Sequence, residues 1–389
     1  MKKAIITFLI AVLCLVFPAG CTPAGDAGSS GDNDSSKIDN NAPAIEGLTY
    51  ESTLELEYAE CFKVYRYEGG YAAIRVDDGN DYLLVPEGGK IPDNLPSNCT
   101  ILQQPLDDVY LVATSVMSMV DEIDAMANVR LSGTKADGWY VQSAIDGMNN
   151  GDILYAGKYS APDYETLVAE NCDLSIQSTM ILHTPEVQEK LEEMGIPVFI
   201  ERAFYEKHPL GRTEWIKLYG ELFGKQDEAS KAFEEQKAYL DALEDFENTG
   251  KTVAFFYVNQ NGTVVTRKTN DYIPAMIELA GGKYVFENLT NDNASSGVNL
   301  TMEEFYATAK DADYIVYNAT IDDPLKSVDD LLQKSNLFAD FKAVKNGNVW
   351  STDKYLYQAA NENGAIIKDF NTMLVDDSVE KLKFMYKLH

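Results

Sequence analysis

Short apolar segments that alternate with helical patterns are the feature that most constrains the fold of this chain. An apolar run at 109–113 precedes a helical pattern at 118–127. A charged amphipathic pattern at 185–194, which begins with proline as helices often do, precedes another apolar run at 196–200. Strands that alternate with helices predict an α/β protein with mostly parallel sheets.

The alternation stops between residues 213 and 247, where helical patterns follow one another without a strand, and it resumes with the strand pattern at 252–258. We therefore predict two Rossmann-like lobes with central mostly parallel sheets, joined by a long rigid α-helix. The predicted domains are an N-terminal lobe at 45–208, connecting helices at 209–249 and a C-terminal lobe at 250–389.

The first part of the N-terminal lobe is predicted to be a β extension. Strand-like segments flank Gly69 and Gly70, which is typical of a hairpin, and the apolar run 82–85 ends at Pro86. Nothing in these residues indicates what the extension does.

The N-terminus is predicted to direct export. Two lysines precede an apolar run at 4–17, which is too short to span a bilayer as a helix, so 1–20 indicates a signal peptide. Cys21 follows small residues, as in a bacterial lipoprotein signal, and would be lipidated; the alternative is an ordinary signal followed by a chance cysteine. Residues 21–44 are rich in Gly, Ser, Asp and Asn, which favours a flexible tether.

Charge and composition exclude several function classes. The 389 residues carry 32 Lys and Arg against 62 Asp and Glu, a formal net charge of -30, which argues against nucleic acid or anionic lipid as a partner. Three histidines are too few for a His-rich metal site, so we expect no metal. Cys61, Cys99 and Cys172 allow one disulfide at most, and buried free thiols are an equal alternative.

Catalytic and nucleotide-binding motifs are absent from the sequence, so we expect no enzyme and no cofactor. Scarce cationic residues and other polar side chains instead follow the predicted strands, where open α/β sheets bind ligands. An anionic, oxygen-rich ligand would suit them, and ordinary surface positions are the alternative. The candidate ligand residues found in this way are Tyr159, Thr179, Glu201, Arg202, Tyr205, Asn259, Arg267 and Tyr272.

Several motifs, in order, resemble the substrate-binding lipoproteins of ABC importers for ferric siderophores, haem and vitamin B12. The segments 161–165 and 172–174, followed by 185–201, resemble the first-lobe pattern of that family. The segment 206–216 resembles the entry to its connecting helix. Second-lobe patterns are matched by Ile277 to Gly282, Met302 to Phe305, Asp313 to Val316, and Ala343 to Trp350.

This resemblance implies a two-lobed clamp that holds its ligand in the cleft between the lobes. It also implies one exposed glutamate per lobe that docks on the permease, and by motif position these are Glu186 and Glu303. The protein would be a monomer outside the bacterial cell membrane, held there only by its lipid anchor. The candidate ligand residues then also include Trp139, Tyr140 and Tyr355.

The ligand class stays open at this point. A ferric siderophore suits the Arg and Tyr residues best, while haem and cobalamin are alternatives for the same clamp. Free zinc or manganese is disfavoured because such sites need several convergent histidines. A surface sensor or adhesin, or an enzyme on the same scaffold, are the rival interpretations.

Overall fold

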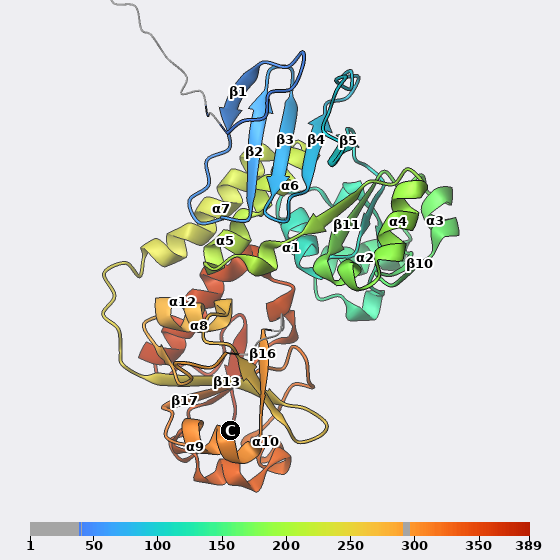
Figure 1. Ribbon diagram of the computed structural model, residues 1–389. Helices are drawn as coiled ribbons and strands as arrows, with labels where there is room; N and C mark the ends of the chain where they lie inside the picture. The colour runs from blue at the N-terminus through green and yellow to red at the C-terminus, as the bar shows by residue number, and fades with distance from the viewer. Residues whose placement is uncertain (1–38, 40, 291–295) are drawn as a thin grey trace, which may run out of the picture. The chain divides into compact units, whose positions relative to one another are not determined.

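The structure is a computed structural model that describes residue 39, residues 41–290 and residues 296–389 (Figure 1). The predicted signal peptide, Cys21 and most of the predicted tether lie outside the described residues. The predicted domain boundaries at 209 and 250 stay predictions.

The predicted β extension is a five-stranded sheet with the order β1-β2-β3-β4-β5. All its neighbouring strands are antiparallel except β4 and β5. Gly69 and Gly70 both have positive φ, near +85°, in the β2–β3 hairpin, which explains the glycine pair. One face contributes Val64 and Ile74 to the core of the N-terminal lobe. The strands are β1 (Tyr50–Thr53), β2 (Phe62–Tyr67), β3 (Tyr71–Val76), β4 (Asp81–Val85) and β5 (Cys99–Gln103).

The N-terminal lobe is built on a parallel sheet with the order β12-β11-β6-β7-β8. The strand order reverses beside β6, which is the kind of switch point where α/β sheets bind ligands. Its strands are β6 (Val109–Leu111), β7 (Val129–Ser132), β8 (Leu154–Tyr155), β11 (Leu174–Ser178) and β12 (Val198–Glu201). Its helices are α1 (Thr114–Glu122), α2 (Gln142–Asn150), α3 (Tyr164–Ala169) and α4 (Pro185–Glu193), with the short pair β9 (Gly157–Lys158) and β10 (Ala161–Pro162).

The connecting segment is a series of three helices rather than one: α5 (Pro209–Glu214), α6 (Ile216–Phe223) and α7 (Gln226–Asp241). Gly224 has φ +67° and ends α6, because this left-handed conformation cannot continue a helix. Every residue of α5 is buried. At the start of α12 (Asn363–Val375), Gly364 lies so close to α7 that a Cβ there would be 2.0 Å from the Gln236 carbonyl oxygen.

The C-terminal lobe has a mixed sheet with the order β16-β14-β13-β17-β18-β19, and β15 also pairs with β13. Its centre is parallel, at β13–β17–β18, whereas β14, β16 and β19 are antiparallel to their neighbours. Phe256 stacks with Phe338 and packs against Phe305 in the main core. The strands are β13 (Thr252–Val258), β14 (Val264–Arg267), β15 (Lys283–Tyr284), β16 (Gly297–Leu300), β17 (Tyr314–Tyr317), β18 (Val349–Thr352) and β19 (Met385–Lys387); the helices besides α12 are α8 (Tyr272–Leu279), α9 (Met302–Ala309), α10 (Val328–Lys334) and α11 (Lys342–Lys345).

Short 3-10 helices complete the described chain. They are η1 (Met126–Asn128), η2 (Ala136–Gly138), η3 (Thr179–His183), η4 (Ala203–Tyr205), η5 (Asn336–Asp340), η6 (Lys354–Tyr357) and η7 (Ala360–Glu362). The predicted α/β architecture with a β extension is confirmed. All three cysteines of the folded part are free thiols, so the disulfide alternative is wrong.

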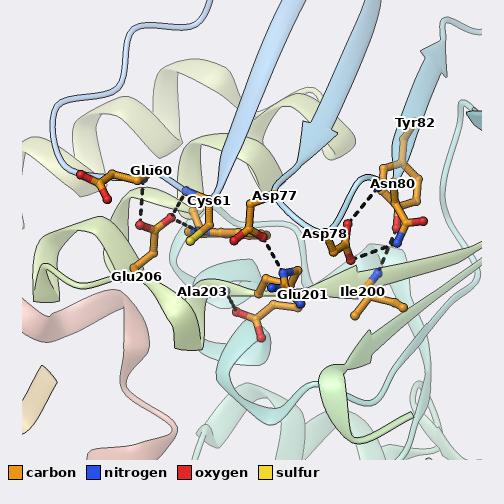
Figure 2. Close-up of polar contacts among 12 residues, drawn as sticks. Glu60, Cys61, Asp77, Asp78, Asn80, Tyr82, Ile200, Glu201, Ala203 and Glu206 are labelled. Atoms are coloured by element: carbon orange, nitrogen blue, oxygen red, sulfur yellow. Dashed lines mark hydrogen bonds and ion pairs between the residues drawn. The ribbon is translucent and has the colours of Figure 1, made fainter. Parts of the chain in front are cut away.

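Two buried carboxylates fasten the β extension to the connecting helices. Glu214 of α5 is fully buried and accepts hydrogen bonds from the backbone N–H groups of residues 57, 58 and 59, at 2.8 to 3.1 Å. Glu206 accepts from the backbone N–H groups of Glu60 and Cys61 (Figure 2) and from the Trp215 indole. The segment before β2 is therefore held by the helices that follow the N-terminal lobe.

Candidate functional site

A cavity of about 420 Å³ lies in the C-terminal lobe, and we call it the C-lobe pocket. Its wall is formed by residues of β13, β14 and β16. Residues after β17 close one end of it. The lining residues are Phe255, Tyr257, Val265, Thr266, Arg267, Ser296, Gly297, Val298, Asn299, Asn318 and Ile321.

Arg267 is the buried cation of this pocket. Its guanidinium donates to the Ser296 hydroxyl at 2.5 Å and lies 5.0 Å from the centre of the Tyr357 ring. Its Nη1 atom is 3.9 Å from a carboxylate oxygen of Asp271. Asn318 donates to the Tyr357 hydroxyl at 3.1 Å, which holds this ring beside the arginine. The pocket thus offers a cation, amides and an aromatic ring to a polar ligand.

A second buried arginine, Arg212 of α5, lies beside the start of α8. Its guanidinium is 3.6 Å from the centre of the Tyr272 ring and 5.5 Å from that of Phe204. Tyr272 begins α8 directly after Asp271, whose side chain caps that helix by accepting from the Ile273 N–H. Arg212 and Arg267 therefore flank one short segment of the C-terminal lobe.

Burial disfavours the charged forms of the two acids beside these arginines. Burial raises the pKa of Glu201, although Arg212 opposes the shift and the Ala203 N–H donates to the carboxylate at 2.7 Å (Figure 2). Burial also raises the pKa of Asp271, and Arg267 opposes it. Each arginine therefore partly offsets the effect of burial on the acid beside it.

Arg202, which the sequence places in the site, is engaged by the β extension instead. Its Nε atom donates to Asp77 at 2.5 Å, and its guanidinium stacks 4.4 Å from the centre of the exposed Tyr205 ring. Burial opposes protonation here, but the Asp77 carboxylate outweighs it and raises the pKa of Arg202. The Asp77 partner offsets the charge of this arginine.

The other candidate ligand residues are distributed over both lobes. Trp139 is buried and donates to the Ser132 hydroxyl, whereas the exposed Tyr140 donates its backbone N–H to Gln358 of the C-terminal lobe. The remaining candidates lie apart from one another. Tyr159 packs beside an N-terminal core cluster, Thr179 begins η3, Asn259 lies in the β13–β14 turn, and the Tyr355 hydroxyl donates to the Glu362 carboxylate. Of all the candidates, Glu201, Arg267 and Tyr272 come together with Arg212, and Arg202 comes together with Tyr205.

The expected docking glutamates are both exposed in the first turn of a helix. Glu186 lies in α4 and Glu303 in α9, and no ion pair to either is present among the described residues. The neighbouring Glu304 is committed to a capping box with Thr301, which leaves Glu303 as the available carboxylate of that turn.

Sequence reasoning missed Arg212, Asn299, Tyr357 and Ser296 as members of the site. Arg212 stands in a segment that the sequence indicates only as the start of a helix. No sequence signal marks it, because the burial of α5 on all sides becomes visible only in the fold.

The structure offers no metal centre in its described part: no group of three or more His, Cys, Asp or Glu side chains there is placed to hold an ion. Residues 39 and 41–290 together with 296–389 also contain no helix long and apolar enough to cross a membrane.

Two curated relatives from Methanocaldococcus jannaschii match most of the chain. One, described as uncharacterized lipoprotein MJ0878, is 24% identical over 402 residues, with 96% of this chain and 93% of the relative covered. Another, uncharacterized lipoprotein MJ0872, is 26% identical over 348 residues, with 86% of each covered.

Solved structures share the fold at low sequence identity. A periplasmic binding protein from Veillonella parvula has a TM-score of 0.56 at 14% identity, with 80% of this chain and 97% of that one covered. An ABC-type Fe³⁺-hydroxamate transport protein from Saccharomonospora viridis has a TM-score of 0.53 at 16% identity, with 70% and 94% covered. The periplasmic haem-binding protein HutB of Vibrio cholerae has a TM-score of 0.54 at 15% identity, with 67% and 97% covered.

Residues 114–356 match the family described as periplasmic binding protein, a range that runs from the start of α1 into η6 and includes the C-lobe pocket. Members of this family bind solutes and are not enzymes, in agreement with the missing catalytic motifs. This chain belongs to the periplasmic binding protein family.

Proposed function

We propose that this protein captures an iron chelate outside the cell membrane and delivers it to an ABC permease. A ferric siderophore is the first candidate for the chelate, and it would bind between the lobes against the C-lobe pocket. The protein itself would make and break no bond.

One observation carries this proposal: a protein of net charge -30 buries Arg267 at the wall of its polar pocket. Burying a cation is costly, and Ser296 and, at 3.9 Å, Asp271 are the described polar partners of Arg267, to which the oxygens of an anionic ligand would add. Ferric chelates present many oxygens, and a guanidinium is well suited to bind them.

Structural likeness supports the same class of ligand. The solved proteins with this fold include ones described as binding haem and as transporting Fe³⁺-hydroxamate. Haem and cobalamin, which solved proteins with this fold are described as binding, are the alternatives for the same clamp, and they enter the experiment below as separate arms. A surface sensor or adhesin is the alternative of another class.

Docking on the permease is assigned to Glu186 and Glu303. Both carboxylates are exposed and one stands on each lobe, so together they could set the orientation of the protein on a two-subunit permease. Lipidation of Cys21 is assigned as the membrane anchor, and the description of two relatives as lipoproteins supports it.

Titration of the purified protein with a ferric hydroxamate, a ferric catecholate, haem and cobalamin tests the ligand class. Quenching of the fluorescence of its three tryptophans would report binding. We expect one class to bind with Kd below roughly 10 µM, which corresponds to about −7 kcal/mol.

Arg267→Gln should weaken binding of an anionic chelate, because it removes the buried cation of the pocket. Arg75→Gln is the matched control, since Arg75 lies on the β extension and its side chain is 44% exposed. If none of the four ligands binds below roughly 10 µM, the chelate assignment is wrong.

A further inference from the structure

Arg212 is the least satisfied charged group described in the molecule. The residue is only 8% exposed, and its Nε and Nη1 atoms are buried without a hydrogen-bond partner among the described residues. Arg267 has the same exposure but donates to Ser296. Between them, Nε and Nη1 carry three N–H donors, so a large part of the donor capacity of Arg212 is unused.

Aromatic rings fix the plane of this guanidinium. Tyr272 lies 3.6 Å from it and Phe204 lies 5.5 Å from it, at distances typical of cation–π contacts. A ring that covers the face of a guanidinium leaves its N–H groups to bond in the plane. Phe204 itself is 41% exposed, so one of the two covering groups borders solvent.

The charges that face Arg212 come from three elements. Glu201 is the last residue of β12, with Arg202 and Glu206 nearby. Asp271 directly precedes α8, and Arg267 and Lys268 lie at and just after the end of β14. Burial raises the pKa of both carboxyl groups, which favours their neutral forms. Neither acid hydrogen-bonds to the unused nitrogen atoms, so neither replaces the hydration that Nε and Nη1 lose on burial.

Unused donors on a buried charge are expensive, because their hydration is lost and nothing replaces it. Nε and Nη1 point to different sides of the guanidinium, so one oxygen cannot satisfy both. An incoming group with several oxygens can, and a planar oxyanion matches the guanidinium geometry.

We infer that Arg212 is a ligand-binding residue and that it receives oxygens of a polycarboxylate-type anion carried by the solute. The inference rests on the proposed function for the place of the solute, and it narrows the solute to one with anionic oxygens rather than a neutral chelate. Arg267, at the wall of the C-lobe pocket, then supplies a second cation to the same solute.

The experiment measures binding of citrate and of ferric citrate to the full chain, by thermal shift and by calorimetry at constant ionic strength. An uncharged ferric trihydroxamate is the neutral comparison. The variants are Arg212→Gln and Arg212→Lys, of which the second keeps the positive charge but loses the paired N–H donors of the guanidinium. The control is Arg130→Gln, because Arg130 pairs with Glu170 away from the site.

We expect Arg212→Gln to weaken the binding of citrate or ferric citrate by roughly 30-fold or more. Arg212→Lys should lie between this variant and the wild type. The control should change neither affinity, and the affinity of any neutral chelate should stay within about threefold in every variant, because no anion is then lost.

Three results would overturn the inference. The wild type could fail to bind either citrate species; Arg212→Gln could bind them as the wild type does; or it could lose anionic and neutral ligands equally, as a purely structural arginine would. If the Gln variant does not fold, the Lys variant decides between the same results. Binding of a neutral chelate alone would uphold the proposed function and refute this inference. Arg212-dependent binding of citrate, with no binding of any iron chelate, would uphold this inference and refute the proposed function.

Discussion

Replacing Glu214 should detach the β extension from the connecting helices. Its side chain is fully buried, its two oxygens accept from three consecutive backbone N–H groups, and Lys217 donates to it at 2.8 Å. A hydrogen bond to a charged group contributes about 1.5–3 kcal/mol. These bonds are not additive, and breaking a buried ion pair costs about 3–5 kcal/mol. We therefore expect Glu214→Gln to lower the free energy of unfolding by about 3–5 kcal/mol.

Urea unfolding followed by far-ultraviolet circular dichroism measures this change. The Gln side chain keeps the shape of Glu but turns an amide N–H₂ toward N–H donors, so the expected loss is mainly electrostatic. Glu303→Gln is the matched control, because its exposed carboxylate has no described partner, and it should stay within about 0.5 kcal/mol of the wild type. A loss below about 1 kcal/mol in Glu214→Gln would refute the idea that this carboxylate fastens the extension.

The remaining predictions concern pH, packing and docking. Burial raises the pKa of Asp369 to about 6, so its contribution to stability is full below about pH 4 and is lost as the pH rises through 6. The difference in the free energy of unfolding between the wild type and Asp369→Asn should therefore change over this range. A difference that stays constant with pH would contradict this prediction. Gly364→Ala should lower the thermal midpoint by several degrees because its Cβ meets backbone at 2.0 Å, and an unchanged midpoint would show that α7 and α12 can separate freely. The double variant Glu186→Ala with Glu303→Ala should abolish stimulation of the permease ATPase while its affinity for the solute stays unchanged. The control Glu304→Ala should lose about 1 kcal/mol of stability through its lost helix cap and should still stimulate the ATPase. Stimulation by the double variant would refute the docking assignment.

Periodic patterns made the fold predictable from the sequence. The charged helix α4 occupies Pro185–Glu193, within the predicted 185–194, because its buried Val187 and Leu191 are four residues apart on one face. The strand β7 was missed, since Arg130 interrupts its apolar pattern. In the fold this arginine reaches Glu170 and two backbone carbonyl groups, and so the strand tolerates it.

The site was predictable only in part, because it depends on contacts between distant segments. Arg267 is found by its position near a strand end, and the structure places it at the wall of a pocket. Arg202 has the same sequence signal, but its pairing with Asp77 depends on the β extension, which no local pattern relates to β12. Arg212 has no such signal, since only the packing of α5 shows it to be buried beside Tyr272.

Equilibrium dialysis of the purified protein against a ferric chelate labelled with radioactive iron tests the central claim most directly. The proposal predicts saturable retention of one chelate per chain, recovery of that chelate chemically intact, and strongly reduced retention by Arg267→Gln but not by Arg75→Gln. Retention that does not saturate, that is equal in the two variants, or that returns an altered chelate would contradict the account of this protein as a chelate-binding member of its family.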